Sequence, residues 1–417
     1  MISRLTRPCA ADRQARRGSL SVLSVFAIVA CGVCVALVVN SSYLSVVRSE
    51  AQQCSEAAAL AGCRSLLCDQ MLCRNQQPFE TEGRIVQCRH TAIEVASLYR
   101  AGTRLPILTE NDITVSHPGT SGDSGSQAMS QQPGVPGFVE VTLNNSATPD
   151  ASGRLFLSGI TGVARGQVVA RATAVMENRI AGFTARSGNA VPLAPFAVPD
   201  DSRRIQSGCW SVDIELNKGA DNFAWSESSQ RVERGGDRLP ETTLTLAFGS
   251  STPAPGRLLP VYVASTGAAS QPLVTQLQSG LSAQHLQSLP NSMLTFPASG
   301  RAATDDASSA SQVAAAFETM IGSVRIFPAA DTAQNSSVTA ENNEADSGSA
   351  AATPATASGV PLTRAVAARI MNVRRGSSND VQITLQPAVI STATAVVGNT
   401  ASATPPNPYI WKIVLAK

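Results

Sequence analysis

The chain has 417 residues, of which 43% are hydrophobic and 15% are charged. That balance excludes a disordered chain and a polytopic membrane protein, and it allows two or three folded domains. The net charge is only +2 and aromatic residues make up 4%, so no basic surface interleaved with stacking rings is present and no nucleic-acid partner is expected.

A basic tail, residues 1–17, comes first. It carries five arginines against one aspartate: Arg4, Arg7, Arg13, Arg16, Arg17 and Asp12. No residue between Ser19 and Val47 is charged, which predicts a transmembrane helix over residues 18–47, because about 20 apolar residues cross a bilayer core of about 30 Å. The positive-inside rule then keeps the tail in the cytoplasm and places the bulk of the chain on the other side. Membrane lipid is therefore a predicted partner.

The predicted span contains small residues that would let another helix approach closely: Ala27, Ala30, Gly32 and Ala36. They predict association with another membrane helix, as a helix–helix oligomer or with a different protein. Cys31 and Cys34 form a CxxC inside the span. Packing is favoured over redox chemistry for this pair, because no strand–helix redox context surrounds it.

The helix is predicted to continue beyond the membrane into a helical region, residues 48–105. A narrow seam of apolar, mostly small residues recurs there at alternating steps of three and four: Leu44, Val47, Ala51, Cys54, Ala58 and Ala61. Such a seam packs closely on another surface. Two interpretations stay open, a partner helix in an assembly or the protein's own exported domain.

The order Arg16-Arg17-Gly18, an uninterrupted apolar segment, Tyr43-Leu44 and then SEAQQCSEAAALAG at residues 49–62 resembles the N-terminus of the TadE/TadG-like proteins of the Flp (tight-adherence) pilus system. The resemblance implies a single-pass inner-membrane protein or pseudopilin that serves pilus assembly, export or surface attachment. Other Tad/Flp pilus components are the partners it implies. Three C-terminal stretches, IGSVRIFPAAD, VAARIMNV and VQITLQPA, also resemble long TadG-like proteins.

Gly18 marks the place where prepilin peptidase would cleave. Pilin-type substrates usually carry Glu at the fifth position after the cleaved Gly, and here that position is Leu23. We therefore expect an uncleaved, TadG-like chain. The alternative is a cleavable signal peptide, for which Val-Asn-Ser at residues 39–41 offers a weak site.

Six cysteines lie on the predicted extracytoplasmic side, where the environment is oxidising. Disulfides are expected among four of them, with the pairing left open: Cys63, Cys68, Cys73 and Cys88. Zinc is the alternative, but the spacing contains no CxxC and only His90 lies nearby, so no metal and no cofactor are predicted.

Residues 106–136 are predicted to be a Ser/Gly/Pro linker. Its GDSGS, residues 122–126, resembles the nucleophile motif of trypsin-like proteases. The resemblance covers five residues of a low-complexity stretch, and the chain has only three histidines. This does not indicate a Ser-His-Asp triad, so no catalytic residue is predicted.

Residues 137–330 are predicted to form an α+β region. Apolar and polar residues alternate, as in strands, at residues 138–143, 167–175, 210–216 and 243–248, and residues 155–160 are predicted as a short helix. Residues 331–359 lack periodicity and are predicted to be a flexible insertion, and residues 360–417 supply C-terminal strands.

The predicted fold class is therefore α+β, with one N-terminal transmembrane helix that continues into a long projecting helix and a strand-rich exported region. The predicted function is a non-enzymatic, membrane-anchored subunit of a Tad/Flp-type pilus assembly or secretion apparatus. The alternative is a membrane-anchored adhesin or ligand-binding protein, and an exported hydrolase has only the GDSGS stretch in its favour.

Overall fold

The computed structural model describes residues 15–73, 81–100, 106–116, 137–144, 153–154, 165–186, 188–201, 203, 206–250, 252–263, 272–302, 308–332, 359–376, 380–398 and 405–416. The GDSGS stretch, most of the predicted linker, the predicted helix at residues 155–160 and nearly all of the predicted insertion lie outside these residues.

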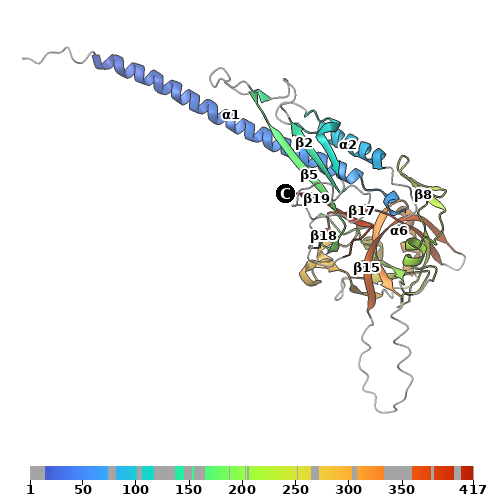
Figure 1. Cartoon of the computed structure of the whole chain (residues 1–417). Coiled ribbons are helices and arrows are strands. Elements are labelled where there is room, and N and C mark those ends of the chain that lie inside the picture. The colour runs from blue at the N-terminus through green and yellow to red at the C-terminus, as the bar shows by residue number, and fades with distance from the viewer. Residues whose placement is uncertain are drawn as a thin grey trace, which may run out of the picture.

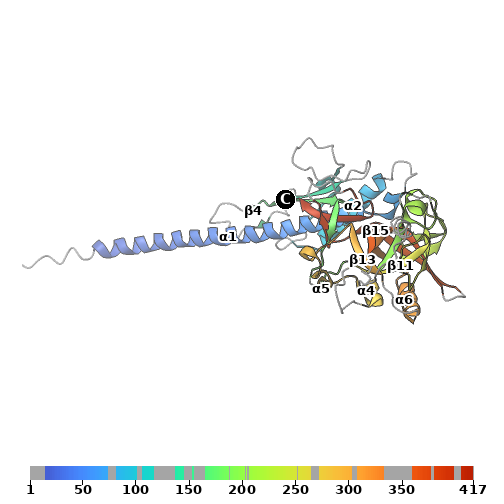
Figure 2. The ribbon, with the colours of Figure 1, turned by 90° about the horizontal axis from the view of Figure 1, so that it is seen from below.

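One helix dominates the shape of the molecule. Helix α1 (Ala15–Ser65) has 51 residues, which corresponds to about 76 Å at about 1.5 Å per residue. Its first half stands clear of the rest of the chain and its second half lies along a strand-rich body (Figures 1 and 2). The helix followed by strands confirms the predicted α+β class.

The first core lies where the second half of α1 meets an antiparallel sheet and helix α2 (Thr81–Ser97). The sheet has the strand order β1-β2-β5-β19-β17: Ile113–Ser116, Phe138–Asn144, Val169–Glu177, Ile410–Ala416 and Ile390–Ser391. A short helix η3 (Glu110–Asp112) leads into β1. Alternate residues of β2 are buried beneath α1, among them Val139 and Val141, so the predicted alternation at residues 138–143 places one face of the strand in this core.

The second core is a closed ring of six strands, β7-β14-β15-β16-β10-β11 and back to β7. Their bounds are Phe196–Asp200, Val324–Asp331, Val360–Arg375, Val381–Pro387, Thr242–Leu246 and Arg257–Tyr262. Strand β13 (Ala298–Ala302) bridges β11 and β15. Closure leaves these strands no free edge, which removes a site for unwanted strand pairing.

Smaller elements surround this barrel. The helices among them are α4 (Leu273–Ser279), α5 (Ala283–Leu286), α6 (Ser308–Thr319), η4 (Ser211–Glu215) and η5 (Pro290–Ser292). A hairpin, β8 (Phe223–Ser226) with β9 (Arg231–Arg234), covers one wall. A small sheet joins β12 (Leu294–Thr295), β6 (Ile180–Phe183) and β18 (Ala395–Val397), and β3 (Gly153–Arg154) pairs with β4 (Arg165–Gly166).

Strand pairing crosses the boundaries that the sequence suggested. Strands β15 and β16, from residues 360–417, complete the barrel with β7 and β10, while β19 from the same region pairs with β5 in the first sheet. The two cores therefore share the C-terminal part of the chain, and neither corresponds to a continuous stretch of sequence.

Asp69, at the start of η2 (Asp69–Leu72), ties the two cores together. Its Oδ2 lies 2.7 Å from Arg369 Nη2 on β15, and its Oδ1 accepts a 2.7 Å hydrogen bond from the Val389 backbone N–H. The Arg369 guanidinium also lies 4.2 Å from the centre of the Trp225 ring on β8. We call Asp69, Arg369, Trp225 and Val389 the clasp.

Candidate functional site

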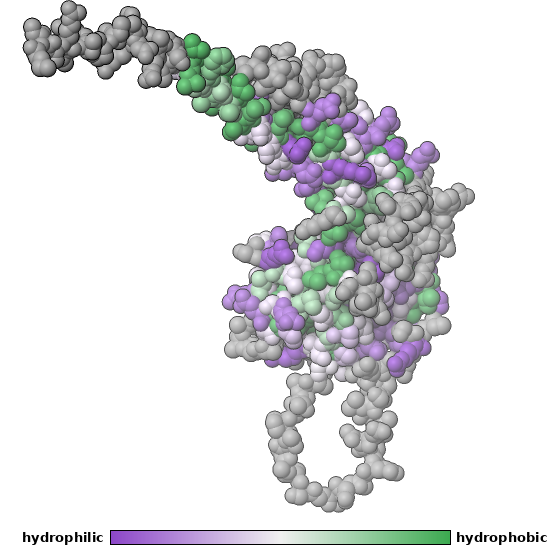
Figure 3. All heavy atoms as spheres, turned by 60° about the vertical axis from the view of Figure 1, so that its left-hand side comes forward, coloured by the Kyte–Doolittle hydropathy of each residue, from purple (hydrophilic) through white to green (hydrophobic). Residues whose placement is uncertain are grey.

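The first half of α1 presents a largely exposed, apolar surface. Large side chains between residues 22 and 39 are mostly exposed, for example Phe26 at 70% and Ile28 at 71%, and the space-filling view shows this stretch as a continuous apolar rod (Figure 3). Among the described residues, α1 is the helix that is long and apolar enough to cross a membrane. Such a surface cannot remain in water, so it marks a membrane or protein contact.

The seam on the second half of α1 is covered by this chain itself. Four of its residues are buried in the first core with β2, β5 and α2: Val47, Ala51, Cys54 and Ala58. The other two, Leu44 and Ala61, are partly buried. The sequence left open whether the seam packs on a partner helix or on the protein's own domain. In the structure it packs on the protein's own domain.

Close packing of α1 on α2 explains the small residues in the seam and at Gly62 beside it. A Cβ added at Gly62 would lie 3.2 Å from Cys88 Sγ and 3.3 Å from the Cys88 carbonyl oxygen on α2. At the other end of the helix pair, Cys54 Sγ contacts the carbonyl oxygen of Ala96 at 3.7 Å. Helices α1 and α2 can approach this closely only because no large side chain stands between them.

The small residues of the span do not all lie on one surface. Ala27, Ala30 and Gly32 are exposed, and nothing lies within 4 Å of a Cβ added at Gly32. Ala36, in contrast, is fully buried by this chain, and Asn40 one turn later is 6% exposed. The role of Ala27, Ala30, Gly32 and Ala36 in helix association stays a prediction.

The four cysteines predicted to form disulfides are free thiols in the structure, and three of them belong to the first core. Cys63, Cys68 and Cys88 are buried, whereas Cys73 is half-buried with its Sγ 3.9 Å from the Arg238 carbonyl oxygen. Burial raises the pKa of Cys88 and of Cys73 to about 11 and raises the pKa of Cys63 further. Neutral, buried thiols react slowly, and disulfide formation among them stays a prediction.

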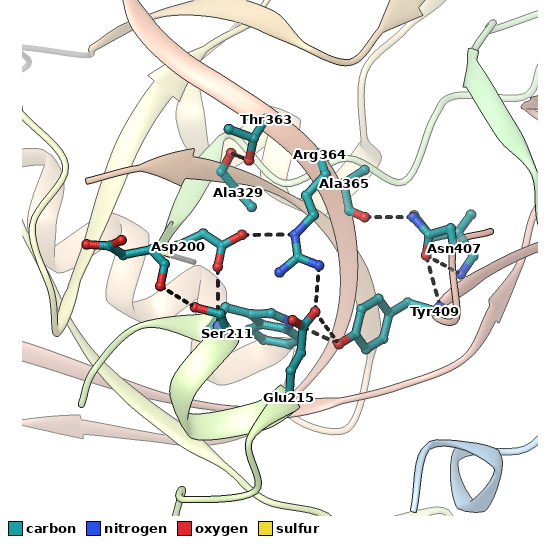
Figure 4. Close-up of polar contacts among 12 residues, drawn as sticks. Asp200, Ser211, Glu215, Ala329, Thr363, Arg364, Ala365, Asn407 and Tyr409 are labelled. Atoms are coloured by element: carbon teal, nitrogen blue, oxygen red, sulfur yellow. Dashed lines mark hydrogen bonds and ion pairs between the residues drawn. The ribbon is translucent and has the colours of Figure 1, made fainter. Parts of the chain in front are cut away.

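A charged network that the sequence did not suggest packs on the second core (Figure 4). Its Trp210 and Tyr409 are buried in that core, whereas the Arg364 side chain is 37% exposed. Arg364 on β15 donates from Nε to Asp200 Oδ2 at 2.9 Å and from Nη1 to Glu215 Oε1 at 2.5 Å. Tyr409 donates its hydroxyl to Glu215 Oε1 at 3.3 Å and accepts from Trp210 Nε1 at 3.2 Å. Burial works against the charged guanidinium, but the two carboxylates outweigh it and raise the pKa of Arg364.

This network fixes the C-terminal segment on the barrel. Asn407 donates to the Ala365 carbonyl at 2.8 Å, and its Oδ1 accepts from the backbone N–H groups of Tyr409 and Ile410. Cavities of about 370 and 230 Å³ flank Tyr409. Ser211 (Figure 4) donates its backbone N–H to Asp200 Oδ1 at 3.2 Å and its hydroxyl to the Asp201 carbonyl oxygen at 2.9 Å. The arrangement anchors the residues that lead into β19.

Residues 18–65 match a family model described as putative Flp pilus-assembly TadE/G-like. The matched segment is α1 without its first three residues, so it contains both the exposed apolar half and the packed seam. The match confirms the predicted resemblance to the TadE/TadG-like family over this helix. Comparisons with curated proteins and with solved structures gave no match.

Proposed function

We propose that this protein is a non-enzymatic, membrane-anchored subunit of a Tad/Flp-type pilus assembly or secretion apparatus. Helix α1 carries the proposal, because the segment that matches the pilus-assembly family is also the segment with an exposed apolar surface. A helix built in this way holds a folded body at a membrane surface while its span remains available to other helices.

The proposed topology is a single pass through the inner membrane with the basic tail in the cytoplasm. Five arginines precede the span, and an excess of Arg and Lys favours retention on the cytoplasmic side. Both cores then lie outside the cytoplasm, either in the periplasm or at the surface. The first core begins on α1 at Val47, with Tyr43 and Leu44 packed against it, where the uncharged stretch ends, which supports a body that sits close to the membrane rather than at the end of a stalk.

We further propose that the span, and not the seam, contacts other pilus components or a second copy of this chain. The seam is occupied by β2, β5 and α2, whereas Ala27, Ala30 and Gly32 are exposed within the apolar half. Small residues let membrane helices approach closely enough for dispersion contacts to hold them together.

The experiment compares two double variants in the native host with the wild type. Ala27→Leu with Ala30→Leu fills the small-residue surface and keeps the span apolar, so the chain still inserts. Val25→Leu with Ile28→Leu has the same spacing and alters only large residues, which makes it the matched control. Readouts are the amount of protein in the membrane, co-purification with the other inner-membrane pilus components and the number of surface pili.

We expect both variants to reach the membrane and only the first to lose co-purification and pili. Equal association of both variants would refute a contact through Ala27 and Ala30. A deletion strain that still assembles pili and adheres normally would refute the pilus function itself.

A further inference from the structure

A groove of about 400 Å³ lies on the outer wall of the barrel, away from α1 and from the charged network. Its floor is the outward face of β10, β16 and β15, and its side wall is the β8–β9 hairpin. The lining consists of Asn222, Phe223, Arg234, Glu241, Thr243, Asn372, Arg374, Gln382 and Thr384. A volume in this range holds a small ligand.

The floor is a regular array of polar side chains. Thr384 pairs in register with Thr243 on one side and with Asn372 on the other, and Gln382 pairs with Arg374. Residues opposite each other on neighbouring strands share a face, so hydroxyl, amide and guanidinium groups form rows across three strands. The intervening residues Leu244 and Ile383 are buried inside the barrel, which fixes the outward direction of the array.

The side wall is held rigidly against the barrel. The Phe223 backbone N–H donates to Glu241 Oε1 at 2.7 Å, and Gln386 Nε2 donates to the Phe223 carbonyl at 3.3 Å and to Asp237 Oδ1 at 2.9 Å. Trp225, two residues further along β8, is covered by the Arg369 guanidinium. A groove whose walls are fixed in advance loses little entropy when a ligand binds.

The chemistry of the lining selects a polar, negatively charged ligand. Arg234 belongs to the side wall and Arg374 to the floor, and neither forms an ion pair with a described residue. Glu241, the lining carboxylate, is 2% exposed and uses Oε1 to hold the hairpin. Arginine binds carboxylates with paired hydrogen bonds, and side-chain amides and hydroxyls both donate and accept.

We propose that this groove binds an acidic oligosaccharide, one that carries a carboxylate or another anionic group on its sugar rings. The amide and hydroxyl rows match the hydroxyl groups of a pyranose chain, Phe223 offers an apolar face for a ring, and the two arginines bind the anionic groups. The binding site goes beyond the proposed pilus function: it would let an assembly subunit contact an acidic polysaccharide outside the cytoplasm.

The test is calorimetric titration of the full-length chain in detergent micelles. Three probes are compared: a galacturonic acid tetramer, a neutral galactose tetramer and a sulfated tetramer derived from heparin. A carboxylate preference appears as tighter binding of the first, and a general preference for anionic sugars as similar binding of the first and third. Both results support the proposal if the neutral tetramer binds at least about tenfold more weakly.

Arg374→Ala is the informative variant and Arg375→Ala is its matched control. Arg375 is the next residue of β15, but its guanidinium pairs with Glu318 on α6, at 3.0 and 3.2 Å. We expect Arg374→Ala to weaken binding of the acidic tetramer about tenfold, the loss of one charge-assisted contact, and Arg375→Ala to leave it unchanged within twofold. Matching thermal unfolding of both variants controls for misfolding.

Several outcomes would overturn the proposal: no binding of any tetramer, equal binding of acidic and neutral tetramers, or equal weakening by both arginine variants. Tighter binding of a single-stranded DNA oligonucleotide than of the acidic tetramers would also overturn it. None of these results would affect the proposed pilus function, which rests on α1.

Discussion

Asp69→Ala should loosen the connection between the two cores. The carboxylate is 16% exposed and its partner Arg369 is 11% exposed, so the pair belongs with buried ion pairs, for which removal of one partner costs about 3–5 kcal/mol. Arg369 keeps two other contacts, the Trp225 ring and a 2.7 Å hydrogen bond to the Gly322 carbonyl. These reduce the penalty, while the orphaned Val389 N–H adds to it. We expect a net loss of about 3 kcal/mol in the free energy of unfolding.

The assay is denaturant unfolding of the full-length chain in detergent, with amide hydrogen exchange at Val389 as a local readout. Asp69→Asn separates the two contributions, because the amide oxygen still accepts from Val389 while the charge is lost. The control is Glu318→Ala, which removes an ion pair whose side chains are 50% and 42% exposed and should cost less than about 1 kcal/mol. A loss below about 1 kcal/mol for Asp69→Ala would show that the clasp does not join the cores.

Three further predictions concern pH, thiols and processing. Burial raises the pKa of Glu241 from 4.5 to about 7, so the folded state binds more protons than the unfolded state between these two pH values. The free energy of unfolding should therefore fall by on the order of 2 kcal/mol as the pH rises from 4.5 to 7. Glu241→Gln should remove this pH dependence from the unfolding curves, and an unchanged dependence would contradict the prediction. The predicted disulfides should protect their cysteines from alkylation when the protein is denatured without reductant. Labelling of all four cysteines would contradict the prediction: Cys63, Cys68, Cys73 and Cys88. Intact mass of the membrane-extracted protein should correspond to a chain that retains the residues before Gly18, and a start at Ser19 would show prepilin-type cleavage.

The sequence was most informative where a pattern depends on neighbouring residues alone. Charge-free length and helical periodicity predicted α1, and alternation predicted β2 and β10, because burial of one face repeats every two residues in a strand. The same alternation at residues 210–216 predicted a strand and was wrong. That segment forms the short π-helix η4, where the Asp213 carboxylate accepts from the Gly208 N–H and the Thr242 hydroxyl. Those partners lie up to 29 residues away, so periodicity cannot reveal them.

Contacts between distant residues account for what the sequence could not predict. The Arg364 network joins Asp200 to a residue 164 positions later, and no local motif indicates such a pairing. The seam shows a subtler limit. Its spacing correctly predicted a surface that must be covered, but identical spacing serves a partner helix and the chain's own sheet. Only the position of β2 and β5 beneath Ala51 and Cys54 distinguishes them.

The pairing of β5 with β19 has a consequence for biosynthesis. Trp411 of β19 is fully buried in the same core as the seam of α1, although the two are separated by most of the chain. A ribosome delivers α1 to the membrane first, yet it must translate nearly the entire chain before the sheet that covers α1 can close. Until then the small apolar residues beyond the membrane remain open to chaperones and proteases, so a prematurely terminated chain would be anchored but left with an unfinished first core that quality control can recognise.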